Sequence, residues 1–153
     1  EPFNKLARGA ATAATAAAAG RLWIAVGTSI RAPAHLNVAL SGWVGVGAGD
    51  SIPQRAFRLG GGATLRGYEA GAFRGTSAYA ASVELSMGGR LLSPLVFADM
   101  GQAAASGVAF SGGPRASVGA GVSVLWGLLR VYLARALEAD KSWRFDMVLH
   151  GLR

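Results

Sequence analysis

With 153 residues, the chain is the size of one domain or of part of a larger one, and only 15% of its residues are charged, against the roughly 25% usual in soluble domains. It contains no cysteine, which excludes a disulfide framework and a cysteine-ligated metal site. The net charge of +7 favours an anionic partner, and lipid head groups fit better than nucleic acid because no basic patch is interleaved with aromatic residues.

The first predicted element is an alanine-rich segment, residues 7–20, which has helix propensity but no decisive period. We expect a strand there only because the segments that follow read as strands. From residue 21 onward, apolar residues alternate with small or polar ones at a period of two, which is typical of strands with one apolar face. The alternation is clear in residues 21–30, 36–46, 77–87, 116–126 and 143–150.

Two further strands, residues 91–100 and 128–137, alternate less regularly. In the first, Pro94 limits the hydrogen-bonded ladder, and two apolar residues share a face with Asp99. In the second, Arg135 falls on the apolar face near the end of the strand. Together with the alanine-rich start and the five regular segments, these give about eight strands.

Short and long connections alternate along the chain. Tight connections are expected at residues 32–35, 88–94 and 126–127. Between them we expect a long loop at residues 49–76, a medium one at 102–115 and a short charged one at 138–142. Short turns on one rim and long loops on the opposite rim are typical of a transmembrane β-barrel. A soluble β-sandwich also alternates, but its solvated faces carry charged residues where these strands carry Ser, Gly and Ala. We therefore predict an all-β, antiparallel transmembrane β-barrel.

The longest loop is basic and glycine-rich but carries no catalytic motif. Its segment RLGGGATLRGYE, residues 58–69, lacks the Gly-Lys-Ser/Thr ending of a phosphate-binding P-loop. The chain has no G-x-S-x-G nucleophile elbow. His35, directly before the predicted strand 36–46, and His150, at the end of the predicted strand 143–150, have no partners at metal-ligand spacing. We expect no catalytic residue, no cofactor and no metal site.

The loop does resemble a known family. Residues 59–69, LGGGATLRGYE, are similar to the long-loop motif of the BamA/TamA superfamily of outer-membrane assembly and translocation barrels (bacterial surface antigen type), whose core reads Arg-Gly-Tyr/Phe. The resemblance continues in order through SVEL, LVFADMGQ, SVGAGVSVLWG, LRVYLARAL and WRFDMVLHG, and so covers most of residues 52–151.

In that family the long loop folds back into the barrel lumen, where its arginine contacts acids on the inner wall. The resemblance places the loop motif at Gly60, Gly61, Arg66, Gly67 and Tyr68. It places the wall partners of Arg66 at Glu84 and Asp99. The sequence supports the assignment of both acids to the inner wall. Glu84 shares a strand face with serines, and an acid at Asp99 would be costly if it faced lipid. We expect Arg66 to hold the loop tip against the inner wall.

The loop also bears on the size of the barrel. An eight-stranded barrel has room inside only for its own side chains, so it would exclude the loop at about 49–76. The family has sixteen strands. We therefore expect residues 1–153 to be the C-terminal part of such a barrel domain, an open curled sheet if it stands alone, with the loop inserted into the lumen.

The resemblance implies a protein of the bacterial outer membrane that assists insertion of outer-membrane proteins or translocation of polypeptides, and that is not an enzyme. Expected partners are outer-membrane lipid and lipopolysaccharide, client outer-membrane or secreted polypeptides and accessory assembly proteins, but not nucleic acid. The alternatives are a barrel that anchors a larger enzyme of the patatin-like lipase type, a passive porin-like channel and a soluble lectin-like sandwich.

Overall fold

The computed structural model describes residues 11–18, 21–31, 36–47, 56–88, 91–105, 109–138 and 142–149. Regular structure in these ranges consists of strands, as the alternation predicted. The strands are β1 (Ala11–Ala18), β2 (Arg21–Arg31), β3 (Leu36–Gly47), β4 (Phe57–Leu59), β5 (Phe73–Gly75), β6 (Ser77–Met87), β7 (Leu92–Ala104), β8 (Arg115–Val124), β9 (Leu129–Ala136) and β10 (Arg144–Leu149). None of the described residues forms a helix that could span a membrane.

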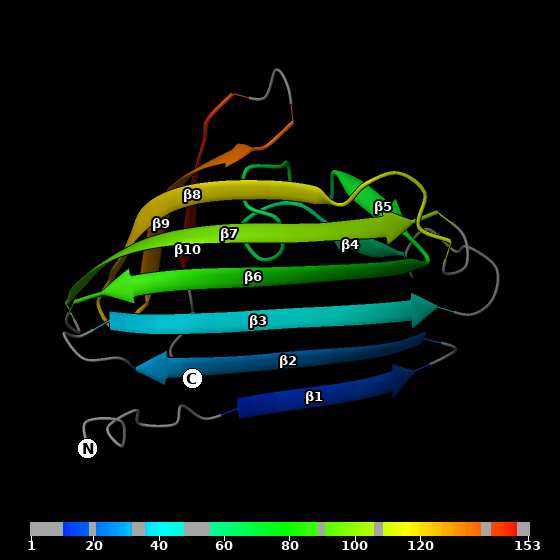
Figure 1. Ribbon diagram of the computed structural model, residues 1–153, viewed down its shortest axis with the longest axis horizontal. Coiled ribbons are helices and arrows are strands. Elements are labelled where there is room, and N and C mark those ends of the chain that lie inside the picture. Colours follow the sequence, from blue (N-terminus) through cyan, green and yellow to red (C-terminus); the bar gives the residue numbers. More distant parts are fainter. Residues whose placement is uncertain are drawn as a thin grey trace, which may run out of the picture.

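Eight of the described strands form one antiparallel sheet in the order β1-β2-β3-β6-β7-β8-β9-β10 (Figure 1). The strands β4 and β5 form a separate two-stranded hairpin in the connection between β3 and β6. Among the described strands, β1 pairs only with β2 and β10 only with β9, so both edges of the sheet are open. The prediction of an all-β, antiparallel, open curled sheet is therefore confirmed.

The two faces of the sheet differ in residue size. One face, which we call the outer face, carries large apolar side chains that are exposed, as in Val83, Leu85 and Met87 of β6. The opposite, inner face carries mostly small and polar side chains, as in Ser82 and Glu84 of the same strand, together with a few large ones such as Phe97 of β7. This division follows from the pleat, because successive side chains of a strand point to opposite faces.

The connections define two rims. The C-terminal ends of β2, β6 and β8, which lead into the short connections, lie on one rim of the sheet, which we call the turn rim (Figure 1). The C-terminal ends of β3, β7 and β9, which lead into the longer connections, lie on the opposite rim, the loop rim.

Some boundaries differ from the predictions. Residues 91–94 were assigned both to a strand and to a tight connection, and the structure places residues 92–94 in β7, where Pro94 pairs with Val122 just beyond the end of the ladder with β6. The long loop, in which no strand was assigned from the sequence, contains the β4–β5 hairpin. The predicted positions of His35 and His150 lie outside the described residues.

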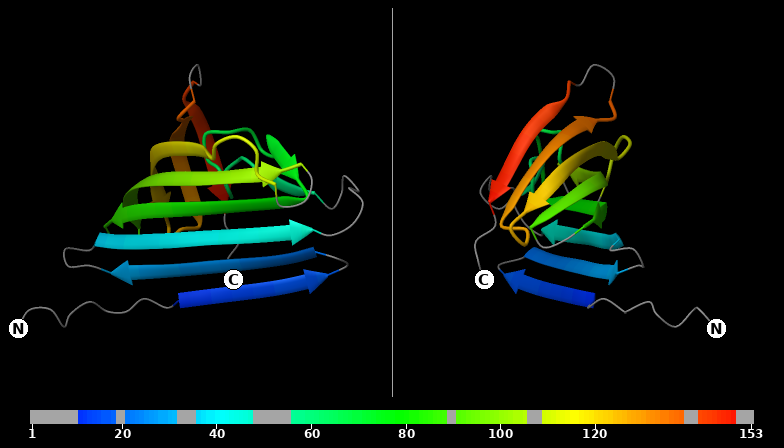
Figure 2. Two further views of the ribbon diagram at one scale, coloured as in Figure 1. Left: turned by 45° about the vertical axis from the view of Figure 1, so that its right-hand side comes forward. Right: turned by 90° about the vertical axis from the view of Figure 1, so that its left-hand side faces the viewer.

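The loop between β3 and β6 packs on the inner face, inside the curl of the sheet (Figure 2). Its side chains Phe57, Leu59, Leu65 and Tyr68 are buried against alanines of β6 and β9. The Phe57 ring lies over Gly45 of β3, where a Cβ atom would collide with it. Full burial of a leucine contributes roughly 1.5–3 kcal/mol, so the loop is held to the wall by a small core of its own.

Candidate functional site

The tip of the loop is a compact turn that begins with two glycines at positive φ, Gly60 (109°) and Gly61 (84°). The Gly60 N–H donates to Thr64 Oγ1 at 2.9 Å, and that hydroxyl donates to the Gly60 carbonyl at 3.1 Å. The Gly61 N–H donates to the Tyr68 carbonyl at 3.0 Å. These bonds close residues 60–68 into one unit, which presents Leu65 and Arg66 to the inner face.

Arg66 is bound to Asp99 of β7 through three hydrogen bonds. The backbone N–H donates to Asp99 Oδ2 at 3.1 Å, Nε–H donates to the same oxygen at 2.8 Å, and Nη2 donates to Oδ1 at 2.6 Å. The side chain of Asp99 is 1% exposed and the residue Arg66 is 7% exposed. The planar guanidinium fork matches a carboxylate in this bidentate geometry, which lysine could not provide.

Glu84 of β6 is the second acid in contact with Arg66, which donates from Nη1 to Glu84 Oε2 at 2.9 Å. Between the two acids, Ser82 accepts from Arg66 Nη2 at 2.8 Å and donates to Asp99 Oδ1 at 2.7 Å. A further arginine, Arg130 of β9, donates to Glu84 at 3.2 Å. We call Arg66, Ser82, Glu84, Asp99 and Arg130 the Arg66 site.

The guanidinium of Arg66 also stacks on an aromatic ring. Its central carbon lies 3.5 Å from the centroid of Phe97, two residues before Asp99 on the same face of β7. The centroid of the Tyr132 ring lies 5.8 Å from the same guanidinium carbon, and the Tyr132 ring packs edge-on against Phe97. A cation over a desolvated ring face gains about 2 kcal/mol. The apolar residues of this face therefore form a platform under the charge.

The charge state of Arg66 follows from these contacts. Burial lowers the pKa of Arg66, but the hydrogen bonds and charges of Asp99 and Glu84 raise it more, so the pKa lies above its ordinary value. The guanidinium is therefore a permanent cation, and the site works as a fixed ion pair and not as a proton donor.

The two residues after Arg66 contact other parts of the wall. Gly67 has φ of 90°, and a Cβ atom there would lie 3.0 to 3.2 Å from backbone atoms of Arg135 and Ala136 in β9. The Tyr68 hydroxyl donates to the carbonyl of Ala116 in β8 at 3.1 Å. The Arg-Gly-Tyr sequence thus reaches β6, β7, β8 and β9 from three consecutive residues.

The structure brings all seven sequence-predicted site residues into this one region, with Arg66 between Glu84 and Asp99. Sequence reasoning missed Ser82 and Arg130 as partners. Alternation had placed Ser82 on the same face as Glu84, which was the available signal. For Arg130 the signal was its place on the polar face of an otherwise apolar strand, but strand order was needed to bring it next to Glu84.

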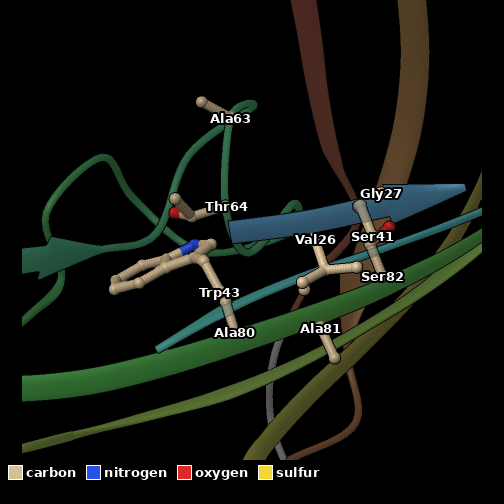
Figure 3. Close-up of a pocket in the computed structure, with 10 residues that line it drawn as sticks. Val26, Gly27, Ser41, Trp43, Ala63, Thr64, Ala80, Ala81 and Ser82 are labelled. Atoms are coloured by element: carbon tan, nitrogen blue, oxygen red, sulfur yellow. The ribbon is translucent and has the colours of Figure 1, made fainter. Parts of the chain in front are cut away.

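A cavity of about 300 Å³ separates part of the loop tip from the wall (Figure 3). Ala63 and Thr64 border it from the loop, and Trp43 and Ser82 from β3 and β6. The tip of the loop is therefore packed tightly against β7 to β9, whereas a cavity lies between it and parts of β2, β3 and β6. Among the described residues no cluster of histidine and acidic side chains could hold a metal ion.

This geometry is that of an anchor, since a fixed cation holds a glycine-rich loop to two acids on a sheet wall. The sequence pattern of the Omp85 superfamily domain matches residues 6–146. No curated protein matches the sequence.

Proposed function

Because the chain belongs to the Omp85 superfamily, whose members are outer-membrane barrels that insert or translocate proteins, we propose that it assists the insertion of outer-membrane proteins or the translocation of polypeptides across the bacterial outer membrane. We propose that the barrel itself catalyses no covalent change. The proposed clients are outer-membrane or secreted polypeptides, and accessory assembly proteins are proposed partners.

The observation that carries this proposal is the docking of Arg66 between Glu84 and Asp99. A buried ion pair contributes little net stability compared with apolar residues, because both charges lose their hydration. A buried ion pair is better suited to holding the segments that carry its two charges in one relative position. In this protein the ion pair fixes a loop inside the curl of the sheet, where the loop sets the shape of the space open to a client.

We propose that the sheet is the C-terminal part of a sixteen-stranded barrel. A closed barrel of eight strands has no room for more than side chains, whereas this sheet holds a loop with its own hairpin on its inner face. Unpaired edges are not tolerated in hydrocarbon. The open edges at β1 and β10 therefore call for further strands.

The outer face fits the same proposal. Its exposed Val, Leu, Ile and Met side chains would be covered by lipid, and the net charge of +7 suits the phosphates of lipid and lipopolysaccharide. Barrel sequences alternate apolar residues toward lipid with small or polar residues toward the lumen. In this orientation the turn rim faces the periplasm and the loop rim faces outward.

A mechanism follows from the anchored loop and the edge strand. The strand β10 is short and pairs with β9 alone among the described strands. In the proposed barrel this edge would meet a further strand at a seam, and where that seam opens the edge offers backbone groups on which an extended client segment can pair. With the loop held at β6 and β7, the inner face beside β10 keeps a fixed shape while a client pairs.

The proposal is tested by placing the intact protein in lipid vesicles and measuring two quantities. The first is the folding rate of an added client outer-membrane protein, or the transfer of a secreted polypeptide across the bilayer. The second is ion conductance. We expect client handling above that of empty vesicles. Conductance without client handling would favour the porin-like alternative and contradict the proposal.

A further inference from the structure

A second polar region lies on the inner face, nearer the turn rim than Arg66. A cavity of about 530 Å³ lies there, a volume in the range of about 300–1,000 Å³ found for ligand pockets. Besides Glu84 of the Arg66 site, six polar side chains from six strands line it. We call these residues the turn-rim row: Arg31, Asn37, Ser86, Ser93, Ser123 and Arg130.

The register of the sheet sets these residues side by side. Arg31 is opposite Asn37, which is opposite Ser86. Ser93 is opposite Ser123, which is opposite Arg130. Directly opposed side chains on one face have Cβ atoms about 4.5–5.5 Å apart. The row is therefore two polar triplets, each ending in an arginine, and it is built on strands whose positions are fixed by their ladders.

The charges of the cavity are unbalanced. The row contains two guanidinium groups and no acid. The acid that borders the cavity is Glu84, which already accepts from Arg66 at 2.9 Å and from Arg130 at 3.2 Å. Across the row and the Arg66 site, three arginines face the two carboxylates Glu84 and Asp99, which leaves one positive charge without a matching acid among these residues.

The chemistry of the lining points to a carboxylate on a peptide. The row has an arginine at each end, and the guanidinium of an arginine binds a carboxylate through two parallel hydrogen bonds. Hydroxyl and amide groups both donate and accept hydrogen bonds. The serines and Asn37 are therefore suited to the N–H and C=O groups of a peptide backbone, where a phosphate would need donors alone.

We propose that the turn-rim row binds a carboxylate of an extended polypeptide, either an acidic side chain or a free C-terminus. The inference rests on the proposed function, because polypeptides are the proposed clients. The polypeptide enters the inner face at the turn rim, where the connections are short. Arg31 and Arg130 bind the carboxylate, and the residues between them bind the neighbouring backbone.

Binding of short fluorescent peptides to the intact protein in detergent micelles tests the site. The reference peptide is uncharged, with glutamines and an amidated C-terminus. One variant peptide replaces the glutamines with glutamates, and another keeps the glutamines and has a free C-terminal carboxylate. We expect at least one variant to bind about tenfold more tightly than the reference, since a charge-assisted hydrogen bond is about twice as strong as a neutral one. The variant peptide that binds more tightly shows whether the site prefers an acidic side chain or a free C-terminus.

Substitutions in the protein assign this preference to the row. We expect Arg31→Gln and Arg130→Gln each to remove most of the preference. Arg31 lies outside the Arg66 site, so its substitution leaves the loop anchor intact and stays informative if Arg130→Gln perturbs folding. The matched controls are Arg58→Gln and Arg74→Gln, which remove the same charge from the exposed face of the β4–β5 hairpin and should keep the preference.

Equal binding of all peptides, or a preference that survives Arg31→Gln, would overturn the inference. Client handling in vesicles without any carboxylate preference would overturn the carboxylate site and leave the proposed function standing. A preference that depends on Arg31, in a protein that handles no client, would support the site and contradict the proposed function.

Discussion

Replacing Asp99 with Ala is expected to lower the free energy of unfolding by about 3–5 kcal/mol, the usual cost of removing one partner from a buried ion pair. Arg66 would lose three hydrogen bonds at once and remain buried with Glu84 as its remaining acid. Denaturant unfolding of the intact protein in micelles measures this loss. Protease cleavage within residues 56–76 should increase as well, because the backbone N–H of Arg66 is released from the wall.

Two further substitutions serve as controls for the stability loss expected of Asp99→Ala. Asp146 is an acid of β10 on the inner face and outside the Arg66 site, so Asp146→Ala removes the same charge without touching the anchor. Asp99→Asn keeps an acceptor oxygen and should fall between the wild-type protein and Asp99→Ala. An Asp99→Ala protein no less stable than Asp146→Ala, with unchanged cleavage of the loop, would show that Asp99 does not hold the loop.

The Gly67→Ala substitution is expected to cost about 2–4 kcal/mol, from two independent causes. A residue with a Cβ atom is strained at φ of 90°, and the new Cβ would press on the backbone of Arg135 and Ala136. That backbone belongs to the β9 ladder and cannot move aside without breaking it. The loop should therefore lift from β9 while the strands persist. Unfolding in denaturant and far-ultraviolet circular dichroism measure the two effects.

Other glycines separate the two causes. Gly71 has φ of 69°, but a Cβ there would meet only the side chain of Arg58, at 3.7 Å. Gly71→Ala should therefore cost only the backbone strain, roughly 1–2 kcal/mol. Gly113 has nothing within 4 Å, so Gly113→Ala should be close to neutral. If Gly67→Ala costs no more than Gly71→Ala, close contact of the loop with β9 is not part of its anchoring.

Much of the fold could be predicted because the sheet separates residue sizes between its faces. Large apolar residues at every second position mark the outer face, and Ser, Gly and Ala mark the inner face. That alternation also placed Glu84 on the inner face, whereas the inward position of Asp99 followed from the family resemblance and from the cost of an acid that faces lipid, and the structure shows both acids on the inner face. Loop lengths predicted which connections lie on each rim. The alanine-rich strand β1 could be assigned only through its neighbours, because alanine fits either face.

The details of the site could not be predicted, because they depend on how the loop folds and on the order of strands. The register that places Ser82 opposite Asp99 and Ser123 opposite Arg130 is a property of paired strands. Arg66 stacks on Phe97 because the loop folds far enough onto the inner face to bring the guanidinium over β7. The β4–β5 hairpin spans three residues in each strand, too short for alternation to indicate it.

A double-mutant cycle between Arg66 and Asp99 tests the anchored loop most directly. The free energy of unfolding is measured for the intact protein, for Arg66→Ala, for Asp99→Ala and for the combined variant. If the guanidinium holds the loop on this acid, the combined variant should lose little more than Asp99→Ala alone, with a coupling energy of about 2–3 kcal/mol. Losses that simply add, with a coupling energy near zero, would contradict the docking of the loop on the inner wall.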